Sequence, residues 1–126
     1  MTIHSLSNRA CEEDRVLTKA IRNMVNFYEL SGKDLSTIMG ISESSATRLN
    51  QGKKIVSPNT KEGEMALLLL RLYRSLNTLV GNNHHKAKAW LNSANTYFKA
   101  KPIDRIKTIT GLVDVVNYLD AMRGKI

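Results

Sequence analysis

Cysteine is nearly absent from the 126-residue sequence, in which Cys11 stands alone. One cysteine cannot form an internal disulfide, and Cys11 has no cysteine neighbours at the spacing of a zinc site. Long hydrophobic runs are missing as well, because the longest covers only residues 65–70, against the roughly 18 residues that a membrane-spanning helix needs. The stretch from Met1 to Arg15 is too polar to contain a signal-peptide core. We therefore expect a cytoplasmic protein with no structural metal and no membrane partner.

Residue groups that carry out catalysis are also missing. The acidic residues form no obvious catalytic pair, and Cys11 has no paired histidine motif. His84 and His85 are adjacent, so on a helix their side chains point about 100° apart and do not converge on one metal ion. We expect both to be solvated residues at a helix start. The sequence thus predicts a protein that is not an enzyme and needs no cofactor.

The composition is that of a chain that folds. Apolar residues make up 42% and charged residues 24%, close to the average for soluble globular proteins. The length suits one compact domain or two small domains that share an interface. Lysine and arginine (19) exceed aspartate and glutamate (11), and the resulting charge of +8 favours a polyanionic partner. However, the excess lies mainly in residues 59–126, so net charge alone does not locate a DNA site.

The spacing of apolar residues predicts an all-α protein. They recur at three- and four-residue intervals along much of the chain, as on the buried face of an amphipathic helix, and no strand-like alternation is long enough to predict a sheet. We expect a flexible arm over residues 1–13, a helix-turn-helix domain over 14–58 and a second helical domain over 59–126. The predicted helices cover residues 15–30, 33–39, 43–50, 60–80, 84–92, 102–107 and 109–122.

The predicted helix over residues 60–80 carries a wide apolar stripe. We expect Asn59 and Glu62 to form a capping box at its start. Two interpretations of the stripe stay open: it is the core of the second half, or part of it is the seam of a homodimer. In the final helix we expect Met122 to be the last core residue. The stripe consists of Met65, Leu68, Leu69, Leu72, Tyr73, Leu76, Leu79 and Val80.

The segment Lys33–Gly52 has the organisation of a helix-turn-helix: a short helix, a turn at Gly40 and a second helix with Ser42 as N-cap. The second helix must enter a major groove about 12 Å wide, so its leading residues must be small and able to form hydrogen bonds. Operator DNA is the partner that this layout predicts, although a purely structural helical bundle would share it. We expect base-edge contacts from Ser44, Ser45 and Arg48, and phosphate-backbone contacts from Ser42, Thr47, Lys53 and Lys54.

Two features nearer the C-terminus leave alternatives open. A basic cluster around a proline is either a solvated surface or a docking face for an acidic partner or flanking DNA. An aromatic pair is either part of the core or an exposed binding anchor. The cluster is Lys99, Lys101, Arg105 and Lys107 around Pro102, and the aromatic pair is Trp90 with Phe98.

Residues 89–125 also carry a series of features whose order and spacing are specific as a set. They are Trp90-Leu91 followed by Asn95, Pro102 opening a helix, Gly111 in the last helix, Val115-Val116-x-x-Leu119, and a terminal Arg123-Gly124. In these features the segment resembles the toxin-binding domain of the Xre/MbcA/ParS-type antitoxins. With the helix-turn-helix upstream and the leucine-rich helix between them, the resemblance covers about residues 15–126.

The resemblance implies a type II antitoxin that forms a homodimer, represses its own operon and neutralises a RES-domain toxin that degrades NAD⁺. In that family the C-terminal region blocks entry to the toxin's cofactor cleft, a role that falls here to residues 123–126 and the face of the last helix. The alternative is a stand-alone helix-turn-helix repressor whose second half only dimerises. The candidate toxin-binding residues are Trp90, Asn95, Lys101, Pro102, Arg105, Arg123, Gly124, Lys125 and Ile126.

Overall fold

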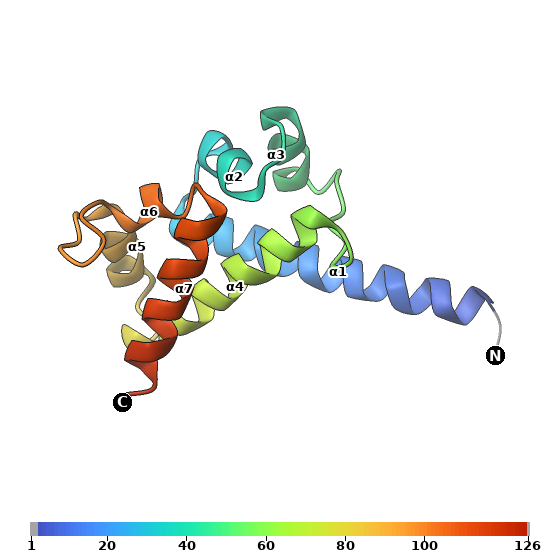
Figure 1. Cartoon of the computed structure of the whole chain (residues 1–126). Helices are drawn as coiled ribbons and strands as arrows, with labels where there is room; N and C mark the ends of the chain where they lie inside the picture. Colours follow the sequence, from blue (N-terminus) through green and yellow to red (C-terminus); the bar gives the residue numbers. More distant parts are fainter. Residues whose placement is uncertain (1–2, 126) are drawn as a thin grey trace.

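Helices make up all the regular secondary structure that the computed structural model describes, which covers the backbone of residues 3–125 and the side chains of residues 12–125 (Figure 1). The all-α prediction is therefore confirmed. In this part of the chain, extended backbone pairs only at an isolated bridge between Asn95 and Ala100. In chain order the helices are α1 (Ile3–Tyr28), α2 (Gly32–Met39), α3 (Glu43–Asn50), α4 (Lys61–Leu79), α5 (His84–Asn92), α6 (Pro102–Arg105) and α7 (Ile109–Arg123).

The first helix is longer than the sequence predicted. α1 begins at Ile3, whereas its apolar stripe starts only after Arg15. Residues 3–14 contain neither glycine nor proline, so nothing in them ends the helix that the stripe specifies. The backbone of the predicted arm is thus helical from Ile3 onward. Residues 1 and 2 lie outside the described part, and the flexibility of the arm stays a prediction.

The turn between α2 and α3 has the predicted chemistry. Gly40 has a φ of 71°, a left-handed conformation that glycine adopts at low cost, and its N–H donates to the Ser36 carbonyl. Ser42 caps α3, because its hydroxyl accepts a hydrogen bond from the Ser45 N–H at 3.0 Å. Both helices at the turn therefore have a defined end.

The start of α4 differs from the prediction. The N-cap is Thr60, whose hydroxyl accepts from the Gly63 N–H at 3.0 Å and donates to the Ser57 carbonyl at 2.8 Å. Thr60 is the last residue with extended backbone, so the helix begins one residue later than a cap at Asn59 would give. The predicted capping box at Asn59 was therefore wrong. Thr108 caps α7, because its hydroxyl accepts from the Gly111 N–H at 3.1 Å.

The core of the molecule is continuous from α1 to α7. α4 packs against both of these helices, and its Leu69, Leu72 and Leu76 are almost completely buried. Each such leucine contributes roughly 1.5–3 kcal/mol through removal of its side chain from water. Because these side chains are buried within one chain, this part of the stripe forms the intramolecular core and no dimer seam runs along it.

The helix-turn-helix and the C-terminus lie on different sides of this core. In Figure 1, α2 and α3 form the top of the molecule, whereas α7 runs down beside α4 to the C-terminus at the bottom. α5 and α6 lie beside α7, and the Lys88 ammonium binds the Glu29 carboxylate at 2.5 Å, which joins α5 to the end of α1. α3 and the C-terminus therefore lie at opposite ends of the view, with α4 and α7 between them.

We predict that Gly111→Ala destabilises the fold. A Cβ at Gly111 would lie 1.8 Å from the Arg105 carbonyl oxygen, and this backbone cannot move away without displacing α6. Overpacking of this kind costs about 1–3 kcal/mol or more of unfolding free energy, which urea denaturation measures. Gly124→Ala is the matched control, since its nearest atoms would be 3.5 Å away. Equal stability of the Gly111→Ala protein and the wild type would contradict this close packing.

Candidate functional sites

The polar face of α3 is turned to solvent. Ala46 and Leu49 are fully buried and fix the helix against the core. With these two residues inside, the side chains of Ser44, Thr47 and Arg48 are left exposed on the outer face. The face has the small polar residues and the guanidinium group that a major-groove helix requires.

The residues around α3 have different surroundings. Thr47 faces the start of α2, because a Cβ on Gly32 would lie 4.0 Å from its hydroxyl. Lys53 is exposed just after α3. The Lys54 ammonium is 3.1 Å from the Glu62 carboxylate, and both side chains are largely buried. Lys54 therefore ties the segment after α3 to the first turn of α4, and its charge is already compensated.

Hydrogen bonds from α1 hold the segment that follows α3. The Thr18 hydroxyl is buried, accepts from the Val56 N–H at 2.9 Å and donates to the Asp14 carbonyl at 2.7 Å. One turn further along α1, the Arg22 guanidinium donates to the Asn50 carbonyl at 3.2 Å. The C-terminal end of α3 and the segment that follows it are thus attached to α1, which helps to fix the orientation of the outer face of α3.

A second exposed surface is built on the turn between α5 and α6. The side-chain oxygen of Asn95 accepts from the Tyr97 N–H at 2.8 Å and the Phe98 N–H at 3.4 Å. The Asn95 carbonyl accepts from the Lys99 N–H at 2.8 Å. Asn95 therefore organises the turn from within, and its amide oxygen is occupied by the turn's own backbone.

Four aromatic side chains gather beside this turn. Trp90 is half-buried, with its ring nearly parallel to Tyr118 at a centroid distance of 6.4 Å and edge-on to Phe98. Tyr97 is 69% exposed, and its ring centroid lies 4.7 Å from that of Tyr118. Trp90 thus packs against Phe98 and Tyr118, whereas the Tyr97 side chain is exposed to solvent.

A groove of about 670 Å³ lies between this turn and the outer face of α7, and we call it the α7 groove. Met122 in its floor is 37% exposed, and the last buried residue of α7 is Leu119. The prediction that Met122 is a core residue was therefore wrong. The floor consists of Asp114, Asn117, Tyr118, Ala121, Met122 and Lys125, the walls include Tyr97 and Phe98, and Arg105 lies at the edge.

Arg123 belongs to a hydrogen-bonded network rather than to a free tail. Its guanidinium donates to the Ser75 hydroxyl oxygen at 3.3 Å, and that hydroxyl donates to the Asp120 carboxylate at 2.6 Å. The bond from Ser75, together with the Arg71 guanidinium at 2.5 Å, holds the pKa of Asp120 below its ordinary value. Arg123 therefore helps to fix the last turn of α7 to α4.

The chain continues beyond this network as a short segment. Gly124 is the C-cap of α7, and the side chain of Lys125 is exposed. Ile126, the remaining candidate in this segment, lies outside the described residues.

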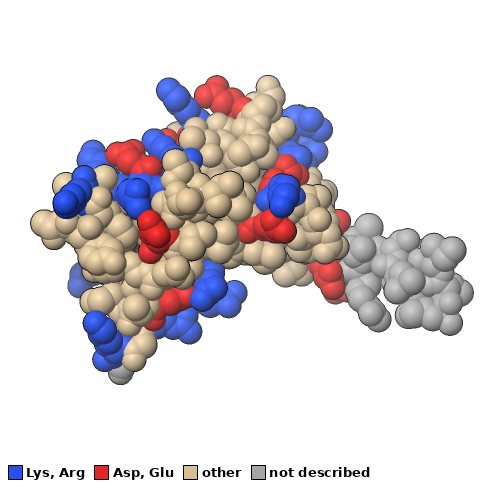
Figure 2. Space-filling view, in the orientation of Figure 1, with Lys and Arg blue, Asp and Glu red and all other residues tan. Residues whose placement is uncertain are grey.

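The predicted basic cluster is not one continuous patch. The Lys107 ammonium binds the Asp34 and Asp104 carboxylates at 3.2 and 3.3 Å, and the bond to Asp34 raises the pKa of Lys107. The Arg105 guanidinium binds the Asp114 carboxylate at 2.6 Å. Lys99 and Lys101 are exposed, whereas Pro102 is buried at the start of α6. Figure 2 shows blue and red side chains interspersed over the visible face.

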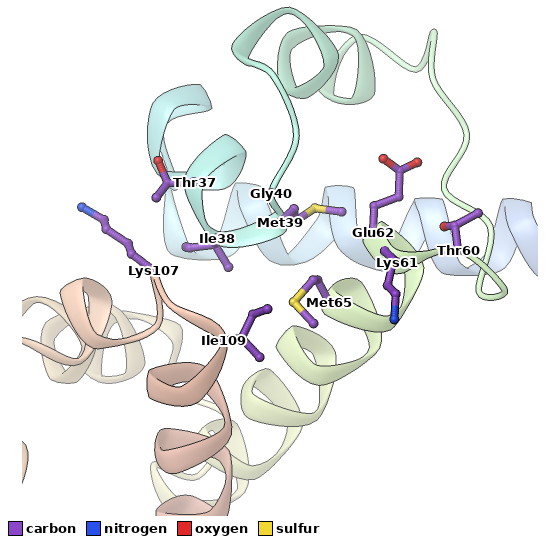
Figure 3. Close-up of a pocket in the computed structure, with 10 residues that line it drawn as sticks. All are labelled: Thr37, Ile38, Met39, Gly40, Thr60, Lys61, Glu62, Met65, Lys107 and Ile109. Atoms are coloured by element: carbon purple, nitrogen blue, oxygen red, sulfur yellow. The ribbon is translucent and has the colours of Figure 1, made fainter.

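A second groove, of about 600 Å³, lies where α2, α4 and α7 meet. In Figure 3 the side chain of Met65 on α4 lies beside that of Ile109 on α7, below Ile38 of α2. Lys107 lines the same groove and bonds to Asp34 of α2, as described above. The groove therefore marks the junction between the helix-turn-helix and the C-terminal helices.

His84 is not the solvated residue that the sequence predicted. Its ring stacks on Phe27 at a centroid distance of 4.1 Å, and its Nε2 atom lies 3.4 Å from the Tyr73 hydroxyl. Among the described residues, no group of three or more histidine, cysteine, aspartate or glutamate side chains could hold a metal ion. None of the helices in the described part has the length and hydropathy to cross a membrane.

Two family models match the chain one after the other. The Antitoxin Xre-like helix-turn-helix domain matches residues 12–71, and the Antitoxin Xre/MbcA/ParS C-terminal toxin-binding domain matches residues 75–125. The chain belongs to the Xre/MbcA/ParS antitoxins. No curated protein gives a significant match to it. The resemblance recognised in the sequence is thereby confirmed, and the antitoxin combines a helix-turn-helix domain with a toxin-binding domain.

The candidate residues of the antitoxin fall into two groups. The DNA-binding candidates all lie on α3 or in the segments that flank it. Among them, Lys54 alone forms an ion pair in the described part of the chain. Of those for the toxin, Trp90, Asn95 and Pro102 support the structure, whereas Lys101 and Lys125 are exposed. Sequence reasoning missed Tyr97 and Tyr118. For Tyr118 a signal existed, because residues 114, 118, 121 and 125 repeat at helical intervals.

We predict that Arg48→Ala weakens binding to DNA that carries the antitoxin's own promoter. Loss of a bidentate base contact costs about 1–3 kcal/mol, which a gel-shift series at fixed salt measures. Arg74→Ala removes the same charge from an exposed position of α4 and is the matched control. Lys54→Ala should have a smaller effect than Arg48→Ala, because Glu62 already neutralises Lys54. Unchanged affinity of Arg48→Ala would remove Arg48 from the DNA-reading residues.

Proposed function

We propose that this protein is a type II antitoxin of the cytoplasm with two activities. It neutralises a RES-domain toxin that degrades NAD⁺, by occluding the toxin's active-site cleft, and it represses its own operon as a homodimer. The helix-turn-helix domain over residues 14–58 binds the operator, and residues 59–126 bind the toxin and contribute to dimerisation. The observation that carries the proposal is the succession of two antitoxin domain matches along one chain.

The separation of the two surfaces supports both activities in one molecule. α3 and the C-terminal end of α7 lie at opposite ends of the view in Figure 1, with the shared core between them. A toxin at the C-terminal end would therefore leave the outer face of α3 accessible. The antitoxin can bind its operator and its toxin at the same time.

Inhibition by occlusion requires shape and charge rather than a catalytic group. Gly124 ends α7, and the exposed side chain of Lys125 lies beyond the Ser75 network that holds Arg123. Lys125 places a cation at this end, where it can form charge-assisted hydrogen bonds with a polar, partly acidic cleft. The choice of a RES-domain toxin as the partner rests on the sequence resemblance. This mode of inhibition makes the antitoxin a non-catalytic protein.

We predict that the antitoxin is a homodimer in solution. One chain carries one helix-turn-helix unit, and such units read two half-sites about one helical turn apart, which requires two chains. Light scattering of the purified protein at tens of micromolar should give twice the chain mass of 14.1 kDa. A monomer at this concentration, with one chain bound per operator, would contradict the prediction.

We predict that deletion of residues 124–126 abolishes or strongly reduces toxin neutralisation. The deletion begins after Arg123, so the Ser75–Asp120 network and all buried residues of α7 are kept, and folding and promoter binding should not change. The measurements are cell survival and NAD⁺ level when the product of the adjoining gene is co-expressed with either form. Lys86→Ala, which removes an exposed cation elsewhere in the toxin-binding domain, is the control.

Two outcomes would contradict this model. Full rescue by the shortened protein would show that another surface carries the inhibition. No rescue by the full-length protein, and no complex with the product of the adjoining gene, would favour the stand-alone repressor instead.

A further inference from the structure

The α7 groove lies entirely inside the toxin-binding domain. Every residue that lines it falls within residues 75–125, the segment matched by the toxin-binding family model. The groove where α2, α4 and α7 meet, by contrast, takes most of its lining from residues 12–71, which the helix-turn-helix model matches. Position in the chain therefore associates the α7 groove with the toxin.

Hydrogen bonds hold the turn that forms one wall of the α7 groove. Asn95 accepts from the N–H groups of Tyr97 and Phe98, and the bridge between Asn95 and Ala100 closes the turn. Tyr97 thus projects from a hydrogen-bonded frame and packs against Tyr118 at its base. An aromatic side chain held in this way loses little conformational entropy when a partner covers it.

The groove also has the composition of an interaction site. Tyr97 and Met122 are two of the large apolar side chains that the toxin-binding domain leaves exposed, and they lie on its wall and its floor. Arg105 and Asp114 of the lining neutralise each other, whereas Lys125 has no ion pair among the described residues. Protein–protein interfaces typically have such an apolar centre surrounded by polar residues, and the residues at the centre contribute most of the affinity.

We propose that the toxin docks in the α7 groove, with an apolar side chain inserted between Tyr97 and Met122 and a neighbouring carboxylate facing Lys125. This inference rests on the proposed function, since it assumes that the domain binds a toxin. It adds the place where the toxin binds and the side chains that make the contact. Docking at the groove adds to occlusion by the segment after Arg123, and the two share Lys125, which lines the groove and lies in that segment. The groove supplies affinity, and the segment reaches the cleft.

The test measures binding of purified antitoxin variants to the purified product of the adjoining gene by isothermal titration calorimetry. Tyr97→Ala and Met122→Ala should each weaken binding at least tenfold, because each removes an apolar anchor. Tyr97→Phe should bind within about twofold of the wild type, since the ring and not the hydroxyl fills the contact. Lys125→Ala should make the affinity less sensitive to salt, because it removes the charge that faces the carboxylate.

Matched controls separate this effect from misfolding. Ile109→Ala and Val16→Ala shorten exposed apolar side chains outside the α7 groove, and both should leave toxin binding unchanged. Promoter binding and thermal unfolding temperature report on the fold of each variant, and we expect them to be unaffected in Tyr97→Ala and Met122→Ala.

The outcomes distinguish the two proposals. If the wild type binds the toxin but Tyr97→Ala and Met122→Ala bind within about twofold of it, the groove is not the docking site, and the proposed function stands. If the wild type does not bind, the proposed function itself fails. If Tyr97→Phe loses as much affinity as Tyr97→Ala, the proposal of an apolar contact at Tyr97 is overturned, because the hydroxyl would then make the contact.

Discussion

Burial of α4 on two sides is the constraint on which the rest of the molecule depends. Leu69, Leu72 and Leu76 pack this helix against α1 and α7, so that the helix-turn-helix and the toxin-binding domain share one hydrophobic core. Neither half of a chain of this length buries enough apolar surface alone to be strongly stable. The same packing fixes the positions of α3 and the α7 groove, because both are built on helices that α4 supports.

Single polar side chains then orient the two functional surfaces. Thr18 on α1 attaches the segment that follows α3, and Asn95 shapes the turn that presents Tyr97. Both use side-chain oxygens to satisfy backbone N–H groups where the chain has no regular secondary structure. Ser75 has a similar role at the end of α7, where its hydroxyl connects Asp120 with Arg123. The two candidate surfaces are thus held by hydrogen bonds, and the interior by apolar packing.

Local chemistry explains which features could be predicted from the sequence. Gly40 and Ser42 specify the turn and the start of α3 through their own backbone and side-chain preferences, so this part of the site followed from the sequence. The contact that fixes Arg123 and the exposure of Tyr97 could not be predicted in this way. Arg123 is fixed by Ser75, which is 48 residues away in the chain, and Tyr97 is exposed by a turn that has no periodic pattern. Met122 continues the apolar spacing of α7 but lines the α7 groove and is 37% exposed, so periodicity alone assigned it to the core.

The position of α4 also limits how such antitoxins can diversify. The helix-turn-helix match ends at residue 71 and the toxin-binding match begins at residue 75, so the border between the two family matches falls inside one continuous helix. Exchange of whole domains between relatives would join two halves of a helix whose buried leucines must suit α1 and α7 together. Recombination at this border therefore carries a high risk of misfolding. Substitutions in the exposed turn after α5 leave the core intact, and they offer these antitoxins a route to new partners that preserves DNA recognition.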